Sequence, residues 1–194
     1  MSTEKNSINT KPDIDYQIEI STQTLERNLG FISNCDNKAS IILTAVGVLL
    51  TIILTNDGIS NIFNLIKSCI STKTFCDIIF LIVFVASLIT LLIGMLLLIC
   101  VLIAKLDLNR IKGIQKNKSR IYFGDIYSHY TYIEYKKAFL KMKKNDLLDD
   151  LISQIFINST IATKKYKRYN LGFKLTMIGF FVFIVVLLIG NYIY

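Results

Sequence analysis

The strongest pattern along the chain is three long runs of apolar residues without a single charge, over 39–55, 78–104 and 175–194. At a rise of about 1.5 Å per residue, a helix over the first run is about 26 Å long and one over the second about 40 Å. The hydrocarbon core of a bilayer is about 30 Å thick, and soluble proteins rarely bury charge-free helices of such length. The pattern therefore predicts three membrane-spanning helices. Buried helices of a soluble protein are the alternative, above all for the first run.

The polar segments before and between the first two spans have a different pattern. Residues 1–14 are rich in Ser, Thr, Asn and Lys, and we expect them to be disordered. Over 15–38, apolar residues such as Leu25 and Leu29 recur at helical spacing, which predicts an amphipathic helix that runs into the first span. The short segment 56–77 is expected to be an outward loop.

Basic residues are distributed unevenly around the spans. Of the 22 Lys and Arg residues, sixteen lie in 105–174, and only Lys67 and Lys73 lie in 56–77. Cytoplasmic segments of membrane proteins carry such an excess. We therefore expect a multi-pass protein whose N-terminus and segment 105–174 are cytoplasmic. A net charge of +8 beside a membrane is more typical of topology signals and attraction to anionic lipid than of nucleic-acid binding.

The segment 105–174 is predicted to contain at least two helices. One is expected over about 131–144, and another is expected to begin near Asn145, whose side chain can cap the first turn. The second helix continues into the third span, and these helices would pack with 15–38 as a bundle. The predicted fold class is an all-α membrane protein with three transmembrane helices and a small cytoplasmic helical bundle. The small size of that bundle favours a homo-oligomer.

The composition gives little support for catalysis or for a metal site. There is one His, His129, and the four Cys are scattered. No glycine-rich phosphate loop or metal-ligand motif occurs, so we expect no catalytic residue, no metal and no cofactor. The spans carry no Asp, Glu, Lys, Arg or His, which argues against a transporter or a charge-selective channel. Cys69 and Cys76 lie in the outward loop and either form a disulfide or act as two small apolar residues.

Small and hydroxyl-bearing residues line one face of the first and of the second predicted span. Such faces let membrane helices approach closely and form hydrogen bonds. Intramolecular packing of the three helices is one interpretation, and a contact between subunits or a membrane defect is the other. The residues assigned to this oligomer or membrane-defect face are Ser40, Thr44, Gly47, Thr51, Ala86, Thr90 and Gly94.

An aromatic stretch follows the second span, with Tyr122, Phe123 and Tyr127 close to Lys118 and Arg120. Aromatic rings can stack on a nucleotide base while a basic side chain meets its phosphate. Tyrosines near a membrane more often anchor at the lipid headgroups. Both interpretations stay open at this point.

Several short elements occur in an order that resembles a known family. Asp-Asn-Lys-Ala-Ser stands at 36–40, directly before the first span, and Phe-Gly-Asp-Ile stands at 123–126, after the second. Gln154, Asn158, Ile161, Lys165 and Tyr166 follow on the helix that leads to the last span. Over about residues 15–190, this order resembles the transmembrane effectors of Pycsar, the bacterial pyrimidine-cyclase antiphage systems.

The resemblance implies an antiphage defence effector in the bacterial inner membrane. A partner cyclase would make a cyclic pyrimidine nucleotide, cCMP or cUMP, and the effector would respond by impairing the membrane, which leads to abortive infection. The alternative function is a membrane scaffold or adaptor that recruits a partner through its cytoplasmic bundle. Nine residues are assigned to nucleotide binding, some through the resemblance and some because they are aromatic or basic. They are Asp36, Lys38, Arg120, Tyr122, Phe123, Asp125, Gln154, Asn158 and Lys165.

Overall fold

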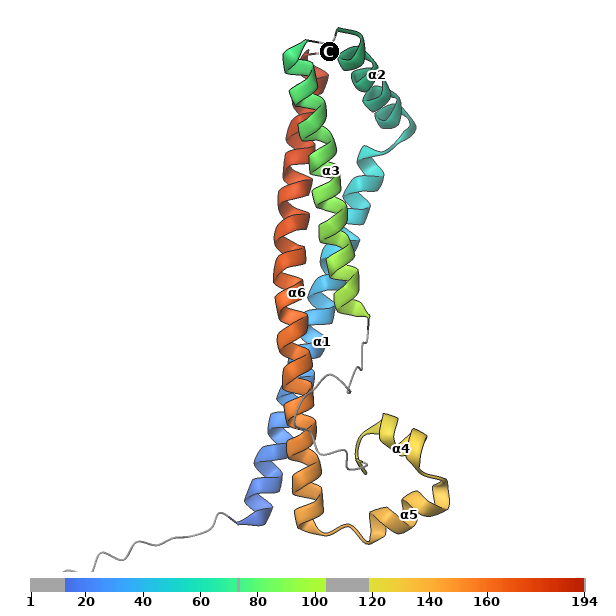
Figure 1. Cartoon of the computed structure of the whole chain (residues 1–194), viewed down its shortest axis with the longest axis vertical. Coiled ribbons are helices and arrows are strands. Elements are labelled where there is room, and N and C mark those ends of the chain that lie inside the picture. The colour runs from blue at the N-terminus through green and yellow to red at the C-terminus, as the bar shows by residue number, and fades with distance from the viewer. Residues whose placement is uncertain (1–12, 73, 104–118, 194) are drawn as a thin grey trace, which may run out of the picture. The chain divides into compact units, whose positions relative to one another are not determined.

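The computed structural model describes residues 13–72, 74–103 and 119–193, and all regular secondary structure in these ranges is helical (Figure 1). The helices in chain order are α1 (Ile14–Ile53), α2 (Asn56–Thr72), α3 (Phe75–Leu102), α4 (Phe123–His129), α5 (Tyr132–Leu140) and α6 (Lys144–Ile193). Three of them, α1, α3 and α6, are long and apolar enough to cross a membrane. This confirms the predicted fold class, an all-helical protein with three candidate membrane spans.

The chain divides into two compact units, and α1 and α6 contribute to both. The first unit contains Met1–Phe31 and Asp107–Ile161, and the second contains Ile32–Leu106 and Ala162–Tyr194. Each of the two helices is continuous, as expected for helices that lead from the polar segments into spans. Residues 1–12, most of the segment expected to be disordered, lie outside the described ranges, and so does Lys118.

In the second unit, α3 and α6 pack along a seam that repeats every seven residues. The buried positions of α3 alternate in steps of three and four, as in coiled coils, and include Phe84, Ser87, Leu91, Gly94, Leu98 and Val101. Gly94 faces Thr176 of α6, and Leu91 faces Gly179. Residue numbers therefore rise along one helix as they fall along the other, so the two helices are antiparallel (Figure 1).

Two glycines bring the backbones of α3 and α6 into direct contact. A Cβ atom at Gly94 would lie 2.4 Å from the backbone nitrogen of Thr176, and one at Gly179 would lie 2.5 Å from that of Leu91. Small residues at such positions allow the close packing that holds helices together in lipid. The Thr176 side chain is fully buried in this seam, and its hydroxyl has no hydrogen-bond partner within the described part of the chain.

The second half of α1 covers part of this helix pair. Cys35 and Ala39 are fully buried and form a cluster with Leu98 and Val101 of α3, bordered by two tyrosines of α6. Farther along α1, few of its residues are buried against the other helices. Only 11% of the residues in its apolar window are buried, against 28% in α3 and 33% in α6. Of the three candidate spans, α1 therefore leaves the largest share of its apolar surface free for lipid or for another chain.

The segment 56–77, expected to be a loop, is mostly the helix α2. Its apolar residues Ile62 and Ile66 pack against the ends of α3 and α6, around Phe84 and Phe183. The difference arises because α2 is stabilised by tertiary burial of one face. A segment this short, with many Ser and Asn residues, gives no strong helical signal by itself.

In the first unit, the beginnings of α5 and α6 are capped by side chains. Thr131 and Glu134 form a capping box at the start of α5. At α6, Asn145 was the expected cap, but the helix begins one residue earlier and Asn145 lies inside its first turn. The Asp146 carboxylate instead accepts a hydrogen bond from the backbone N–H of Lys143, at 3.2 Å.

Polar contacts join α1 to α6 in the first unit. The Lys144 ammonium lies 2.7 Å from a carboxylate oxygen of Asp15, and the Asn28 side chain donates to the backbone oxygen of Ile155 at 3.3 Å. These pairs are separated by 129 and 127 positions in the sequence, so the two helices run parallel here. Leu29, expected on the inward face of α1, is 49% exposed, because Asn28 occupies the position that faces α6.

We expect Gly94→Ala and Gly179→Ala to lower the free energy of unfolding by about 1–3 kcal/mol each, the usual cost of overpacking. The added methyl group would overlap the backbone of the facing helix. Titration of the purified protein with a denaturing detergent measures this. Gly47→Ala on α1 is the matched control, since no atom of another described helix lies within 4 Å of the added group. Equal unfolding free energies for all three variants would contradict the close contact.

Candidate functional site

The residues assigned to nucleotide binding fall into two clusters, one in each unit. Those in the first unit are Arg120, Tyr122, Phe123, Asp125, Gln154 and Asn158. Those in the second unit are Asp36, Lys38 and Lys165. Within each cluster, some side chains that are far apart in the sequence come into contact.

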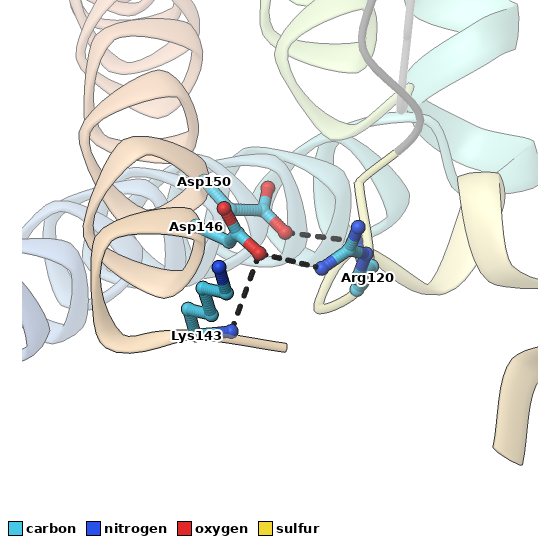
Figure 2. Close-up of polar contacts among 4 residues, drawn as sticks. All are labelled: Arg120, Lys143, Asp146 and Asp150. Carbon is cyan, nitrogen blue, oxygen red and sulfur yellow. Dashed lines mark hydrogen bonds and ion pairs between the residues drawn. The ribbon is translucent and has the colours of Figure 1, made fainter. Parts of the chain in front are cut away.

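Arg120 holds the segment before α4 against the first turns of α6 (Figure 2). Its guanidinium Nη1 donates to Asp146 Oδ2 at 3.2 Å, and its backbone N–H donates to Asp150 Oδ2 at 2.8 Å. The side chains of Arg120 and Asp146 are partly exposed, at 32% and 47%. The positive charge of Arg120 is therefore accessible but already paired with a carboxylate. An arriving phosphate would compete with Asp146 for the guanidinium.

The turn that follows Arg120 is ordered by Ser119 and Asp125. Ser119 is buried, and its hydroxyl accepts a hydrogen bond from the backbone N–H of Tyr122 at 2.9 Å. The Ser119 backbone N–H donates to Asp125 Oδ2 at 3.0 Å, and the Tyr135 hydroxyl donates to the Arg120 backbone oxygen at 3.2 Å. Asp125 therefore holds the turn that presents Arg120.

The aromatic residues after this turn form an accessible surface. The rings of Tyr122 and Phe123 contact each other with centroids 4.9 Å apart and planes tilted by 55°. Phe123 is 71% exposed and Tyr127 is 91% exposed. The pKa of Tyr122 is raised, mainly by burial and to a smaller extent by the Asp125 carboxylate. The exposed Phe123 ring can stack on a planar ligand without displacing other side chains.

Gln154 and Asn158 lie one turn apart on α6, on the inward side of the first unit. Gln154 is only 6% exposed. The Asn158 side-chain amide donates to the backbone oxygen of Gln154 at 2.8 Å. Asn158 is thus engaged by its own helix, and a ligand would reach Gln154 only if the first unit rearranged.

In the second unit, Asp36 of α1 and Lys165 of α6 form an ion pair. The Lys165 ammonium lies 2.6 Å from Asp36 Oδ1 and 2.7 Å from Oδ2. The Lys165 side chain is 12% exposed and that of Asp36 is 32% exposed, so the lysine is mostly buried while the carboxylate is partly open to solvent. Lys38 is exposed and makes no ion pair within the residues that the structure covers. Of the three residues assigned here, the structure brings two together.

The small-residue face of the first span is uncovered in the single chain. Ser40, Thr44 and Thr51 are exposed, and Gly47 is half-buried. The Thr51 hydroxyl donates to the Gly47 backbone oxygen at 2.9 Å, so it needs no partner from outside its own helix. This face remains a prediction for a contact between subunits.

The corresponding face of α3 changes its surroundings along the helix. Ala86 is exposed, Thr90 is half-buried with its hydroxyl bonded to the Ala86 backbone oxygen at 2.8 Å, and Gly94 is buried. At Gly94 the structure supports the intramolecular alternative, because this residue packs against α6.

Sequence reasoning missed the carboxylates that hold Arg120. Asp146 and Asp150 are recognisable in the sequence as acids in the first turns of a helix, which stabilise its N-terminal end. They are also four residues apart, so both lie on the same helix face, where they can hold one basic residue. That spacing is the available signal, but it does not identify the partner.

Two hydrogen bonds lower the pKa of Asp146. The larger effect comes from the backbone N–H of Lys143, and the next largest from the Arg120 side chain. The ionised form therefore stabilises the fold above the ordinary Asp pKa of about 3.9, and this contribution is lost as pH falls through the lower folded-state value. We expect Asp146→Asn to lower the thermal unfolding temperature at neutral pH but not in strong acid. Thermal unfolding followed by circular dichroism across a pH series tests this, with the exposed Asp149→Asn as control. A difference that does not depend on pH would contradict it.

Comparison with known proteins covers nearly the whole chain. A family model described as the Pycsar effector protein domain, PycTM, matches residues 20–190. The chain is 29% identical over 182 residues to "Pycsar effector protein GmPycTM" from Gulbenkiania mobilis, with 86% of this chain and 89% of that protein covered. No solved structure is significantly similar. Because the family model covers residues 20–190, which include both clusters and most of each candidate span, the chain belongs to the Pycsar effector family.

Proposed function

We propose that this chain impairs the bacterial inner membrane when it is activated by a cyclic pyrimidine nucleotide, cCMP or cUMP, from a partner cyclase. The infected cell then dies before phage are released. The observation that carries the proposal is the family match over 20–190, which makes the chain an effector of antiphage defence. The match includes the Arg120 cluster, the Asp36–Lys165 pair and most of the three candidate spans.

The continuity of α1 and α6 supports a mechanical route from ligand to membrane. Each helix contributes to the first unit and continues as a candidate span. A helix is stiff because each turn is hydrogen-bonded to the next, so a shift at one end reaches the other. A ligand that binds one arrangement of the first unit more tightly than another shifts the population toward that arrangement.

The first unit offers the groups that a cyclic nucleotide requires. In our proposal the phosphate binds Arg120 and the base stacks on Phe123. The phosphate then replaces the Asp146 carboxylate, which now neutralises the guanidinium at 3.2 Å. That exchange loosens the connection between the α4 segment and α6, and so couples binding to a movement of α6.

The second unit contributes the Asp36–Lys165 pair, which ties α1 to α6 next to the start of the first predicted span. A charge-assisted hydrogen bond of this kind is stronger than one between neutral groups. In our proposal, it makes α1 follow the movement of α6. Lys38, which is exposed, stays assigned to nucleotide binding, as a basic group that an anionic ligand can reach.

Topology and assembly complete the proposal. The excess of basic residues in 105–174 favours a cytoplasmic location for this segment and for the N-terminus. The messenger is made in the cytoplasm and would reach the first unit there. The exposed face of Ser40, Thr44 and Thr51 is the surface that we assign to contacts between subunits of a homo-oligomer, because hydroxyl-bearing faces join helices in lipid.

The experiment that tests the function expresses the chain in bacteria with a pyrimidine cyclase or with an inactive cyclase. We expect loss of membrane potential and uptake of an impermeant dye only with the active cyclase. In parallel, purified protein in detergent is titrated with cCMP, cUMP and cyclic AMP. An intact membrane potential during messenger synthesis would refute the proposal. Recruitment of another protein without depolarisation would favour the scaffold alternative.

The ion pair gives a sharper version of this test. We expect Asp36→Lys to reduce messenger-dependent dye uptake by at least about fivefold, the lower end of typical coupling between sites. The double variant Asp36→Lys with Lys165→Asp restores opposite charges and should recover a large part of the response. Lys164→Ala at matched expression is the control, because Lys164 is exposed and adjacent to Lys165, and it should respond like the parent chain. A full response by Asp36→Lys would contradict the coupling role.

A further inference from the structure

α2 connects the first candidate span to the second and has two distinct faces. At about 100° per residue, its apolar residues occupy one continuous arc of roughly 160°, and its polar residues occupy the rest. The residues of the apolar arc are Ile59, Ile62, Phe63, Leu65, Ile66, Cys69 and Ile70.

Protein covers only part of this apolar arc. Leu65 is 7% exposed and Cys69 is 4% exposed, so this side of the arc is buried. On the adjoining side, Ile59, Phe63 and Ile70 are 42%, 69% and 54% exposed. The apolar surface of α2 is therefore wider than the protein surface that it packs on.

The buried contacts of α2 place it beside the ends of the candidate spans. A Cβ atom at Gly190 of α6 would lie 3.2 Å from Leu65. A small apolar cavity is shared by α2, by Phe80 of α3 and by Leu187 of α6. These partners lie inside charge-free stretches, and the stretch 78–104, at about 40 Å, exceeds the roughly 30 Å hydrocarbon core. Phe80 lies three residues from Asp77, the charged residue that ends this stretch, so Phe80 and α2 beside it lie near the edge of the core.

We propose that α2 lies in the membrane interface and binds lipid directly, with Phe63 and Ile70 among acyl chains and Lys67 beside a lipid phosphate. The residues that flank α2 in the chain are also apolar and exposed, since Leu54 is 45% and Phe75 is 76% exposed. Lys67 lies at the border between the apolar and polar arcs, the position from which lysine reaches the headgroups. A shallow open groove runs along this face of α2, lined by Phe63, Asn64, Ile66, Lys67, Ile70 and Ser71.

This placement joins all three candidate spans to one leaflet of the bilayer. The cluster that α2 packs on contains Phe84 of α3 and Phe183 of α6, and Ile53 at the end of α1 borders it. In this placement α2 contacts lipid on one side and the ends of the spans on the other. A change in the packing of that leaflet would therefore reach the ends of the spans through α2. The inference does not depend on the proposed function.

The chain contains no Trp, so a single introduced Trp reports on one position. We expect Phe63→Trp, in the full chain reconstituted into phosphatidylethanolamine and phosphatidylglycerol vesicles, to emit at short wavelength. We also expect a nitroxide near the headgroups to quench it more than a nitroxide deep in the acyl chains. Phe181→Trp is the matched control. Phe181 is 70% exposed within the third candidate span, so the deep nitroxide should quench it more.

The outcomes are distinct. Emission typical of water, without quenching by either nitroxide, would overturn the proposal. Emission at short wavelength that no lipid nitroxide quenches would also overturn it, because a second copy of the chain would then cover the face. Ile70→Trp repeats the measurement if Phe63→Trp fails to insert. Adding Lys67→Glu to Phe63→Trp should shift the emission to longer wavelength, and an unchanged spectrum would overturn the role of Lys67.

Discussion

In a bilayer, two helices gain nothing by burying apolar surface against each other, because lipid chains are equally apolar. The second unit therefore depends on the backbone contact between α3 and α6 at Gly94 and Gly179. Van der Waals contact at this distance is available only where no Cβ atom intervenes. α1 packs across this pair through Cys35 and Ala39, and α2 rests on its end near Phe84. Without the close α3–α6 contact, neither would have a surface to pack on.

The elements governed by the bilayer could be predicted from the sequence. A span must be apolar, free of charge and long, and 39–55, 78–104 and 175–194 meet these requirements by inspection. Elements that depend on tertiary contacts could not be predicted. α2 owes its helical form to the α3 and α6 residues beneath it, which no local pattern reveals. Asn28 replaces Leu29 on the face toward α6 because a backbone oxygen of Ile155 is within reach.

In the candidate sites, too, the suitable residues could be predicted from the sequence but their tertiary contacts could not. Asp36 and Lys165 were both assigned to nucleotide binding, and the structure adds that they bind each other. No reasoning from one segment could predict this contact, because the two residues are 129 positions apart. Arg120 was assigned for its charge alone, whereas its contacts with Asp146 and Asp150 depend on how the turn at Ser119 folds. The sequence identifies which groups are chemically suitable, and the fold determines which of them are already engaged.

The seam between α3 and α6 contains one polar atom that the contact does not satisfy. Thr176 is fully buried, and its hydroxyl finds no acceptor among the described residues. A buried hydroxyl without a partner costs about 1–3 kcal/mol. This cost works against the packing that Gly94 and Gly179 make possible. A small sliding or rotation of α6 that offered the hydroxyl an acceptor would recover that energy, so the tightest packing of the two helices and their lowest free energy need not coincide.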